Sequence, residues 1–96
     1  MEINNIPDIF SSKLRLAAIA ALIEGPKTFS ELKDITKSTD GNLGAQLSKL
    51  EGNGVLVVEK TFVNRKPQTT YGLTDEGRAI FREYVDLLDS IIKGNK

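Results

Sequence analysis

The stretch TFSELKDITKSTDGNLGAQLSKLEG, residues 28–52, contains two helical patterns separated by a short polar turn. Thr28 and Glu31 have the spacing of a capping box, so a helix is expected to begin here and to run to about Thr36. After the polar turn, three leucines recur at i, i+4 and i+7, which is one narrow helical stripe. Two short helices joined in this way predict a helix-turn-helix, although a plain helical hairpin would show the same pattern.

Helical patterns continue on both sides of this stretch. Residues 13–24 are apolar and rich in alanine, with Ser11 or Ser12 as a cap and Gly25-Pro26 as a stop, which predicts a central first helix. Within the first short helix of the pair, Leu32 and Ile35 are expected to form the buried edge.

The pattern changes to strand-like spacing after Gly54. Residues 55–62 are rich in β-branched side chains, and residues 69–73 alternate in polarity. The segment between them is polar and contains a proline, so we expect a β-hairpin over about 55–73 with a turn at 63–68. Because aromatic side chains on strands are more often buried than exposed, Phe62 and Tyr71 are both expected in the core.

The last segment, about 75–93, is expected to form a helix capped by Thr74. At 100° per residue its apolar side chains cover an arc of roughly 160°, against roughly 100° for an ordinary surface helix. We therefore expect one stripe to pack within the chain and the other to meet a second copy, unless an amino-terminal segment folds back over it. One stripe is Ile80, Tyr84, Leu87 and Ile91, and the other is Phe81, Val85, Leu88 and Ile92. Because the sequence does not tell which stripe faces the second copy, all eight residues are named for the dimer interface. The apolar start of the chain, Ile3, Ile6, Ile9 and Phe10, is expected to join this interface.

The composition of the 96 residues narrows the possible functions. A hydrophobic share of 40% and a charged share of 27% are typical of a globular chain, and we treat residues 1–96 as one domain. The sequence has no cysteine and no histidine, which removes disulfides, the usual zinc ligands and the commonest nucleophiles and bases. We therefore expect no enzymatic activity, no metal and no cofactor.

Two further features of the sequence concern its location and its charge. The longest apolar run, residues 16–23, is too short to span a membrane, and no basic leader precedes it, so a cytoplasmic protein is expected. The 13 basic and 13 acidic residues cancel, which is unusual for a protein that binds nucleic acid. Only residues 59–70, around the expected hairpin turn, are clearly positive, with three basic residues and one acidic residue.

Taken in order, these segments resemble the short stand-alone winged-helix transcriptional regulators related to the MarR and ArsR groups. The residues that carry the resemblance are Leu14-Arg15-Leu16, Phe29-Ser30-Glu31-Leu32, Thr39-Asp40-Gly41-Asn42-Leu43, Leu47-Ser48-Lys49-Leu50-Glu51, the segment 59–67 and Tyr71-Gly72-Leu73-Thr74-Asp75-Glu76-Gly77. The resemblance covers essentially the whole chain. It implies an α+β fold, mainly α with a small β-hairpin, in which a winged helix-turn-helix is followed by a long C-terminal dimerisation helix. It also implies a dimeric, cytoplasmic, sequence-specific DNA-binding regulator without an obligatory cofactor.

The residue types of the third helix and of the hairpin turn are suited to contacts with double-stranded DNA. Asn and Gln side chains can pair with adenine in the major groove, and a lysine can reach a guanine edge or a phosphate. Hydroxyl groups at a helix start suit a phosphate, and a basic hairpin tip suits the backbone or the minor groove. The expected DNA contacts are Ser38, Thr39, Asn42, Ala45, Gln46, Lys49, Asn64, Arg65 and Lys66, to which Lys33, Lys37 and Lys60 could add phosphate contacts.

Asp40 is the residue that fits this expectation least, because a carboxylate at the start of the third helix repels phosphate. We expect it to cap the helix or to pair locally. A winged-helix module that binds other proteins and no DNA remains the alternative, since the net charge is zero. The sequence names no operator and no small-molecule effector.

Overall fold

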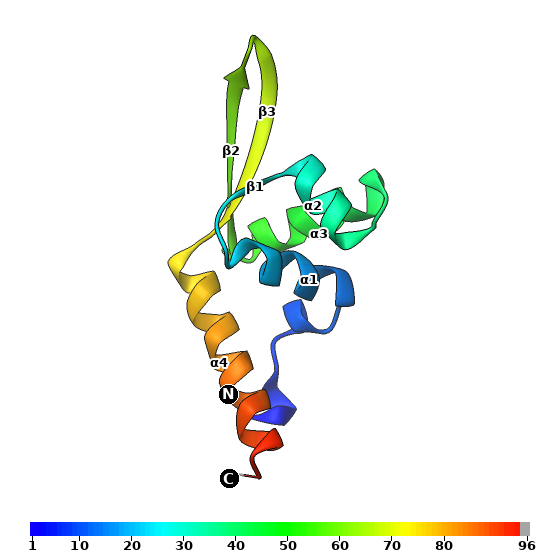
Figure 1. Ribbon diagram of the computed structural model, residues 1–96. Coiled ribbons are helices and arrows are strands. Elements are labelled where there is room, and N and C mark those ends of the chain that lie inside the picture. Colours follow the sequence, from blue (N-terminus) through cyan, green and yellow to red (C-terminus); the bar gives the residue numbers. More distant parts are fainter. Residues whose placement is uncertain (95–96) are drawn as a thin grey trace.

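The computed structural model describes residues 1–94, apart from the side chain of Ile3, and its elements follow the predicted order (Figure 1). The elements are η1 (Ile3–Asn5), η2 (Asp8–Phe10), α1 (Lys13–Leu22), β1 (Lys27–Thr28), α2 (Phe29–Thr36), α3 (Asp40–Gly52), β2 (Leu56–Val63), β3 (Lys66–Leu73) and α4 (Asp75–Ile92). The predicted α+β winged-helix fold is confirmed.

A short strand that the sequence pattern does not reveal completes the sheet. The three strands are antiparallel in the order β1-β3-β2. In β1, Lys27 pairs with Tyr71 and Thr28 pairs with Thr70. Two residues are too few to show an alternating pattern, yet their pairing ties the start of α2 to the base of the hairpin.

The turn of the hairpin is shorter than the six residues predicted. The two strands pair as far as Val63 and Lys66, which leaves Asn64 and Arg65 as a two-residue turn. Both have positive φ, 53° and 65°, as a type I′ turn requires. Proline lacks the backbone N–H that a strand donates to its neighbour. Pro67 is nevertheless tolerated within β3, because β1 pairs only with Thr70 and Tyr71 and leaves the edge of β3 at Pro67 without a partner strand.

The core lies where α1, α2 and α3 meet the base of the hairpin. The large side chains with less than 2% exposure are those of Ile19, Leu22, Leu32, Leu43, Leu47, Leu50 and Val55. The predicted burial of the three leucines of α3 is therefore confirmed. The prediction for Ile35 is wrong, because this side chain is 49% exposed. It lies at the end of α2, beside the first turn of α1, where an open groove replaces the core.

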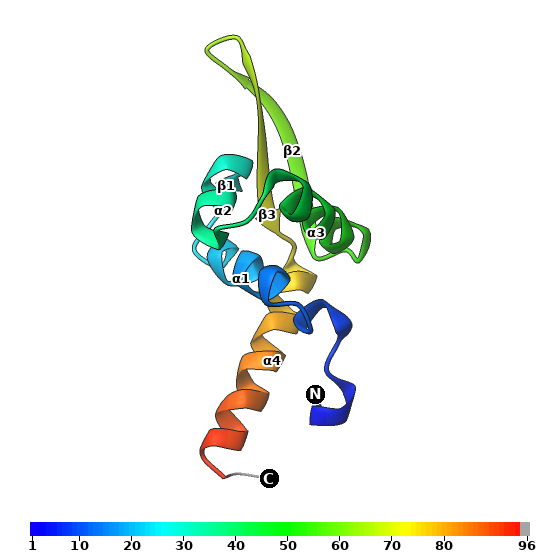
Figure 2. The ribbon, with the colours of Figure 1, turned by 90° about the vertical axis from the view of Figure 1, so that its right-hand side faces the viewer.

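Two extensions leave this body in opposite directions, the hairpin at one end and α4 at the other (Figures 1 and 2). The molecule is accordingly elongated, with extents of 53 × 25 × 21 Å. The hairpin continues past the helices, so Phe62 near its tip is 77% exposed and the prediction that it lies in the core is wrong. Tyr71, nearer the base, packs against the core and against Phe29, with ring centroids 6.3 Å apart.

The start of α4 is held against the beginning of β2. The Thr74 hydroxyl accepts a hydrogen bond from the Gly77 amide at 2.9 Å and donates to the Gly54 carbonyl at 2.7 Å. A Cβ at Gly77 would lie 2.5 Å from the Val55 carbonyl oxygen, so only glycine allows this close approach.

The apolar surface of α4 follows the two predicted stripes except at its two ends. Ile80, Tyr84 and Leu87 of one stripe are half-buried and Val85, Leu88 and Ile92 of the other are exposed, whereas Phe81 is half-buried and Ile91 is exposed. Up to the middle of the helix the large apolar side chains pack within the chain: Tyr84 stacks on Phe10 with centroids 4.3 Å apart, and Phe81 packs on the same ring at 6.3 Å. In the second half, four apolar side chains are 40% to 82% exposed: Val85, Leu88, Ile91 and Ile92. No helix within residues 1–94 is long and apolar enough to cross a membrane.

Candidate nucleic-acid interface

The outer face of α3 is free of packing and carries short or polar side chains. Thr39 caps the helix by accepting from the Asn42 amide at 3.2 Å. With its leucines buried, the helix leaves Asn42, Ala45 and Lys49 exposed, as predicted for a face that could contact DNA. The exposed Ser48, three residues after Ala45, belongs to the same face, although it is not among the contacts predicted from the sequence.

Gln46 is placed differently from the other expected contacts on α3. It is half-buried, and its Oε1 accepts a hydrogen bond from Nη1 of Arg15 on α1. Because a guanidinium only donates, the amide must present its oxygen to Arg15, which leaves Nε2 as the group that can still donate. Gln46 therefore serves as a structural partner of Arg15 in addition to whatever it contacts outside the chain.

Arg15 is the one buried charged side chain in the described part of the chain, with 6% exposure. Besides Gln46, it donates to the Asp8 carbonyl at 2.9 Å, the Ile9 carbonyl at 3.3 Å and the Ser11 hydroxyl at 3.3 Å. These bonds satisfy a group that would be costly to bury alone. They also connect α3 to the segment before α1. The sequence signal for this role is weak, namely an arginine between two leucines in an apolar helix.

The start of α3 is electrically neutralised within the chain. Asp40 pairs with Lys33 of α2 at 2.7 Å, which confirms the expectation that this carboxylate pairs locally. Ser38 is half-buried, with its hydroxyl 2.8 Å from that of Thr36, whereas Thr39 is exposed. The pair leaves Lys33 less available for a phosphate than predicted, and it removes the repulsion that Asp40 alone would cause.

An open groove of about 540 Å³ lies beside this helix start, between the first turn of α1 and the end of α2. Two lysines line it, Lys13 and Lys37, together with Ser38 and Asn42, and its described lining contains no acidic residue. Lys37 has a left-handed conformation, φ 56°, where the chain turns from α2 toward α3. The groove thus adds Lys13, which was not predicted as a contact, to the positive charge next to α3.

The tip of the wing places the remaining predicted contacts at the far end of the hairpin. Asn64, Arg65 and Lys66 are all exposed, and so is Lys60 on β2. Within residues 1–94, none of these three cations lies within ion-pair distance of a carboxylate. Their charge is therefore open to an external anion.

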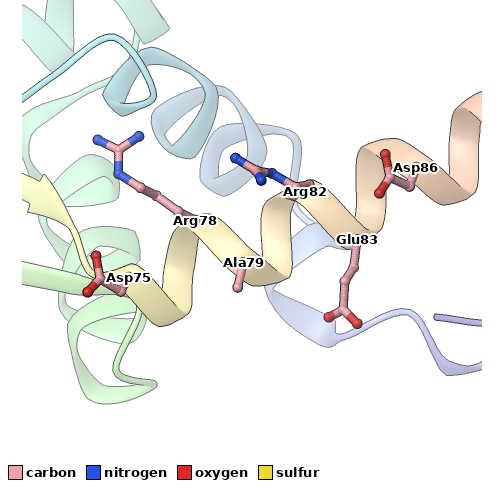
Figure 3. A pocket seen from close by; sticks show the side chains of 6 residues that line it. All are labelled: Asp75, Arg78, Ala79, Arg82, Glu83 and Asp86. Atoms are coloured by element: carbon pink, nitrogen blue, oxygen red, sulfur yellow. The ribbon is translucent and has the colours of Figure 1, made fainter.

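A second groove, which lies along α4, has a different character (Figure 3). Its lining combines two arginines with three acids: Asp75, Arg78, Ala79, Arg82, Glu83 and Asp86. Arg78 also donates to the Ile23 carbonyl at 3.3 Å. Mixed charge of this kind is typical of a solvated helix face and does not suit a polyanion. The described residues also contain no group of three or more acidic side chains that could hold a metal ion.

The predicted dimer residues are distributed over both halves of α4. Three of them, Ile80, Phe81 and Tyr84, pack partly on the core of the same chain. Leu87 is half-buried, and the other four, named above for the second half of the helix, are exposed.

Comparison with known proteins agrees with this architecture. The family model of the winged helix DNA-binding domain matches residues 14–92. An uncharacterized protein of Methanocaldococcus jannaschii is 35% identical over 79 residues, which are 80% of this chain and 85% of the relative.

Solved structures give the same result. A transcriptional regulator homologue from Pyrococcus horikoshii superposes with a TM-score of 0.82 and 28% identity, over 90% of this chain and 86% of the other. A protein from Enterococcus faecalis described as a transcriptional regulator of the MarR family superposes with a TM-score of 0.80 and 27% identity, over 91% of this chain and 79% of the other. The chain belongs to the winged helix DNA-binding domain family and is similar in structure to regulators of the MarR type.

Proposed function

We propose that this chain is a sequence-specific transcriptional regulator that binds double-stranded DNA as a homodimer. The observation that carries the proposal is the unpacked polar face of α3, flanked by a basic wing tip and a basic groove. The family match and the similarity to transcriptional regulators support it.

In this proposal the outer face of α3 enters the major groove. Asn42 and Lys49 contact base edges, while the small side chains of Ala45 and Ser48 allow the helix to approach closely. Gln46 takes part through its Nε2 alone, as a donor to an acceptor on the DNA, because its oxygen is bound by Arg15. A bidentate pair between Gln46 and adenine is therefore not part of the proposal.

The phosphate backbone is bound on both sides of α3. Thr39, Ser38 and the two lysines of the groove face the backbone at the helix start. On the other side, Asn64, Arg65 and Lys66 of the wing contact the backbone and the minor groove. These positive groups are concentrated locally, so the zero net charge of the chain does not prevent binding.

The second half of α4 forms the interface between the two copies. Phe10 already covers Phe81 and Tyr84 within the chain, so a folded-back amino-terminal segment accounts for the first half of the helix only. The exposed side chains of Val85, Leu88 and Ile91 form a continuous apolar surface, which a second copy would cover. A two-fold dimer would place two α3 helices in successive major grooves, about one helical turn apart.

Selection of bound duplexes from a random pool, followed by mobility-shift titration, tests the proposal. We expect Asn42→Ala to weaken binding to the selected site by about 1–3 kcal/mol, with little change on random duplexes. Asn4→Ala, which removes an exposed amide far from α3, is the matched control. Failure of the unaltered protein to bind any duplex at moderate salt would instead favour a protein-interaction module.

A further inference from the structure

Phe62 is an exposed aromatic residue whose position the fold itself does not explain. It lies on β2, two residues before the turn, and 77% of its surface is open to solvent. Its partner across the hairpin is Pro67, so two apolar side chains lie opposite each other near the wing tip. Together with Pro67, which is also exposed, Phe62 forms a small apolar patch that a partner outside the chain can cover.

The direction of Phe62 follows from the alternation of β2. Residues 56, 58 and 62 lie on one face of the strand, since successive side chains point to opposite faces. At the base of the hairpin this face is turned toward the helices, because Leu56 is buried and Tyr71, opposite Val58, packs against Phe29. Phe62 therefore belongs to the face of the hairpin that packs toward the helices at the base, although near the tip it lies beyond them and is exposed.

The charge around Phe62 selects the kind of partner. Lys60 shares its face and Arg65 follows at the turn, whereas the one acid of the segment, Glu59, is on the opposite face, together with Lys66, which pairs with Val63. The minor groove of DNA has apolar sugar walls between two rows of phosphates, and proteins that bind it often combine cations with an inserted apolar side chain. A phenylalanine bordered by cations matches that arrangement.

We propose that Phe62, with Pro67 opposite, packs against the deoxyribose walls and base edges of the minor groove. The proposal rests on the DNA-binding function above and adds a non-electrostatic contact to it. Arg65 at the turn and Lys60 on the same face as Phe62 hold the wing to the phosphates, and Phe62 enters the groove beside them. Such a contact makes affinity depend on the shape of the groove at base pairs that no polar side chain reads.

Fluorescence anisotropy with the selected duplex, measured over a range of salt concentrations, tests the proposal. We expect Phe62→Ala to weaken binding by about 5- to 20-fold at every salt concentration, with an unchanged slope of log K against log salt, because the variant keeps every cation that meets a phosphate. Phe62→Leu should recover most of the affinity. The matched control is Val63→Ala, an adjacent side chain that is 48% exposed on the opposite face, and it should bind like the unaltered protein.

The other outcomes separate the possible failures. Equal affinities of the Phe62→Ala and Val63→Ala proteins, with normal binding by the unaltered protein, would overturn the role of Phe62 and leave the proposed function intact. A change in sedimentation equilibrium caused by Phe62→Ala in the absence of DNA would overturn it too, because the residue would then join two copies. Loss of DNA binding by the unaltered protein itself would remove the proposed function and this interaction together.

Discussion

The two extensions of the molecule expose apolar side chains in opposite charge environments. The wing carries Phe62 within residues 59–70, where basic residues exceed acidic ones by two. Helix α4 carries Val85, Leu88 and Ile91, and its residues 75–92 contain five acids and two arginines. The wing tip and the C-terminal end of α4 are the far ends of two long elements that extend from the same small core (Figure 1).

The comparison shows that exposed apolar surface does not identify its partner without the charges beside it. A polyanion is attracted to the wing and repelled by α4, whereas the apolar side chains of α4 can be covered by the same apolar side chains of a second copy. This contrast supports the proposals that the wing contacts DNA and that the second half of α4 forms the dimer interface.

The largest effect is expected from a charge placed in the apolar surface of α4. Leu88→Asp would bury two carboxylates in the two-fold interface, and we expect it to weaken dimerisation on the order of 1,000-fold. Sedimentation equilibrium at micromolar concentration measures this. Ala79→Asp, which adds the same charge at an exposed position of the same helix, should remain dimeric. If the unaltered protein were monomeric, the exposed apolar surface of α4 would not be a dimer interface.

The next effect concerns the cations of the wing. The double variant Arg65→Ala, Lys66→Ala should lower DNA affinity on the order of 100-fold at 0.1 M salt and make the slope of log K against log salt shallower. The slope should change by about one unit for every phosphate that each bound chain no longer neutralises. Titration at several salt concentrations measures both quantities. An unchanged slope would take the wing tip out of the DNA interface.

A smaller effect should follow from adding charge to the wing. Glu59→Lys replaces the one acid of residues 59–70, and we expect about a 5- to 10-fold gain in affinity for random duplexes, with a steeper salt dependence. Glu83→Lys makes the same change of net charge on α4. If both variants gained the same DNA affinity, binding would depend on the total charge of the chain and not on its location. The difference in charge between the wing and α4 would then not explain which of them binds DNA.

The smallest effect is expected in the body between the two extensions. The Glu31 carboxylate accepts the Thr28 backbone N–H, and this hydrogen bond lowers the pKa of Glu31 below its ordinary value of 4.5. The carboxylate therefore stabilises the folded state above that value, and the stabilisation is lost as the pH falls through the lowered pKa.

Urea unfolding between about pH 3 and pH 7 measures this dependence. Glu31→Gln can keep the capping hydrogen bond without the charge, so its stability should lack this part of the acid dependence. Dimerisation and DNA affinity at pH 7 should stay within about twofold. A pH profile identical to that of the unaltered protein would show that the Glu31 charge contributes nothing measurable to folding.

The sequence predicted the elements well where a long periodic pattern meets a packed core. The three leucines of α3 and the cap at Thr28 are such cases, and both are confirmed. The prediction failed for Phe62 because alternation identifies the face of a strand, whereas burial depends on how far neighbouring helices extend beside it. The prediction for Ile35 failed for the same reason at the end of α2.

For the candidate interface, the sequence predicted which helix and which hairpin expose polar and basic residues. It did not predict that Gln46 is bound to Arg15, because this hydrogen bond joins residues 31 positions apart and depends on the packing of α1 against α3. Lys13 and Lys37 come together in one groove for a similar reason. Contacts between elements follow from tertiary packing, which local patterns do not contain.

The short segment before α1 has a consequence for the geometry of the operator. Residues 8–10 are held by Arg15, which also holds α3, and by Tyr84 of α4, which stacks on Phe10. The same few residues thus link α3, the helix proposed to read bases, to α4, the helix proposed to join the two copies. In the proposed dimer, the number of base pairs between half-sites would then depend on this guanidinium and this ring stack, and operators of another length would be bound only by bending the duplex.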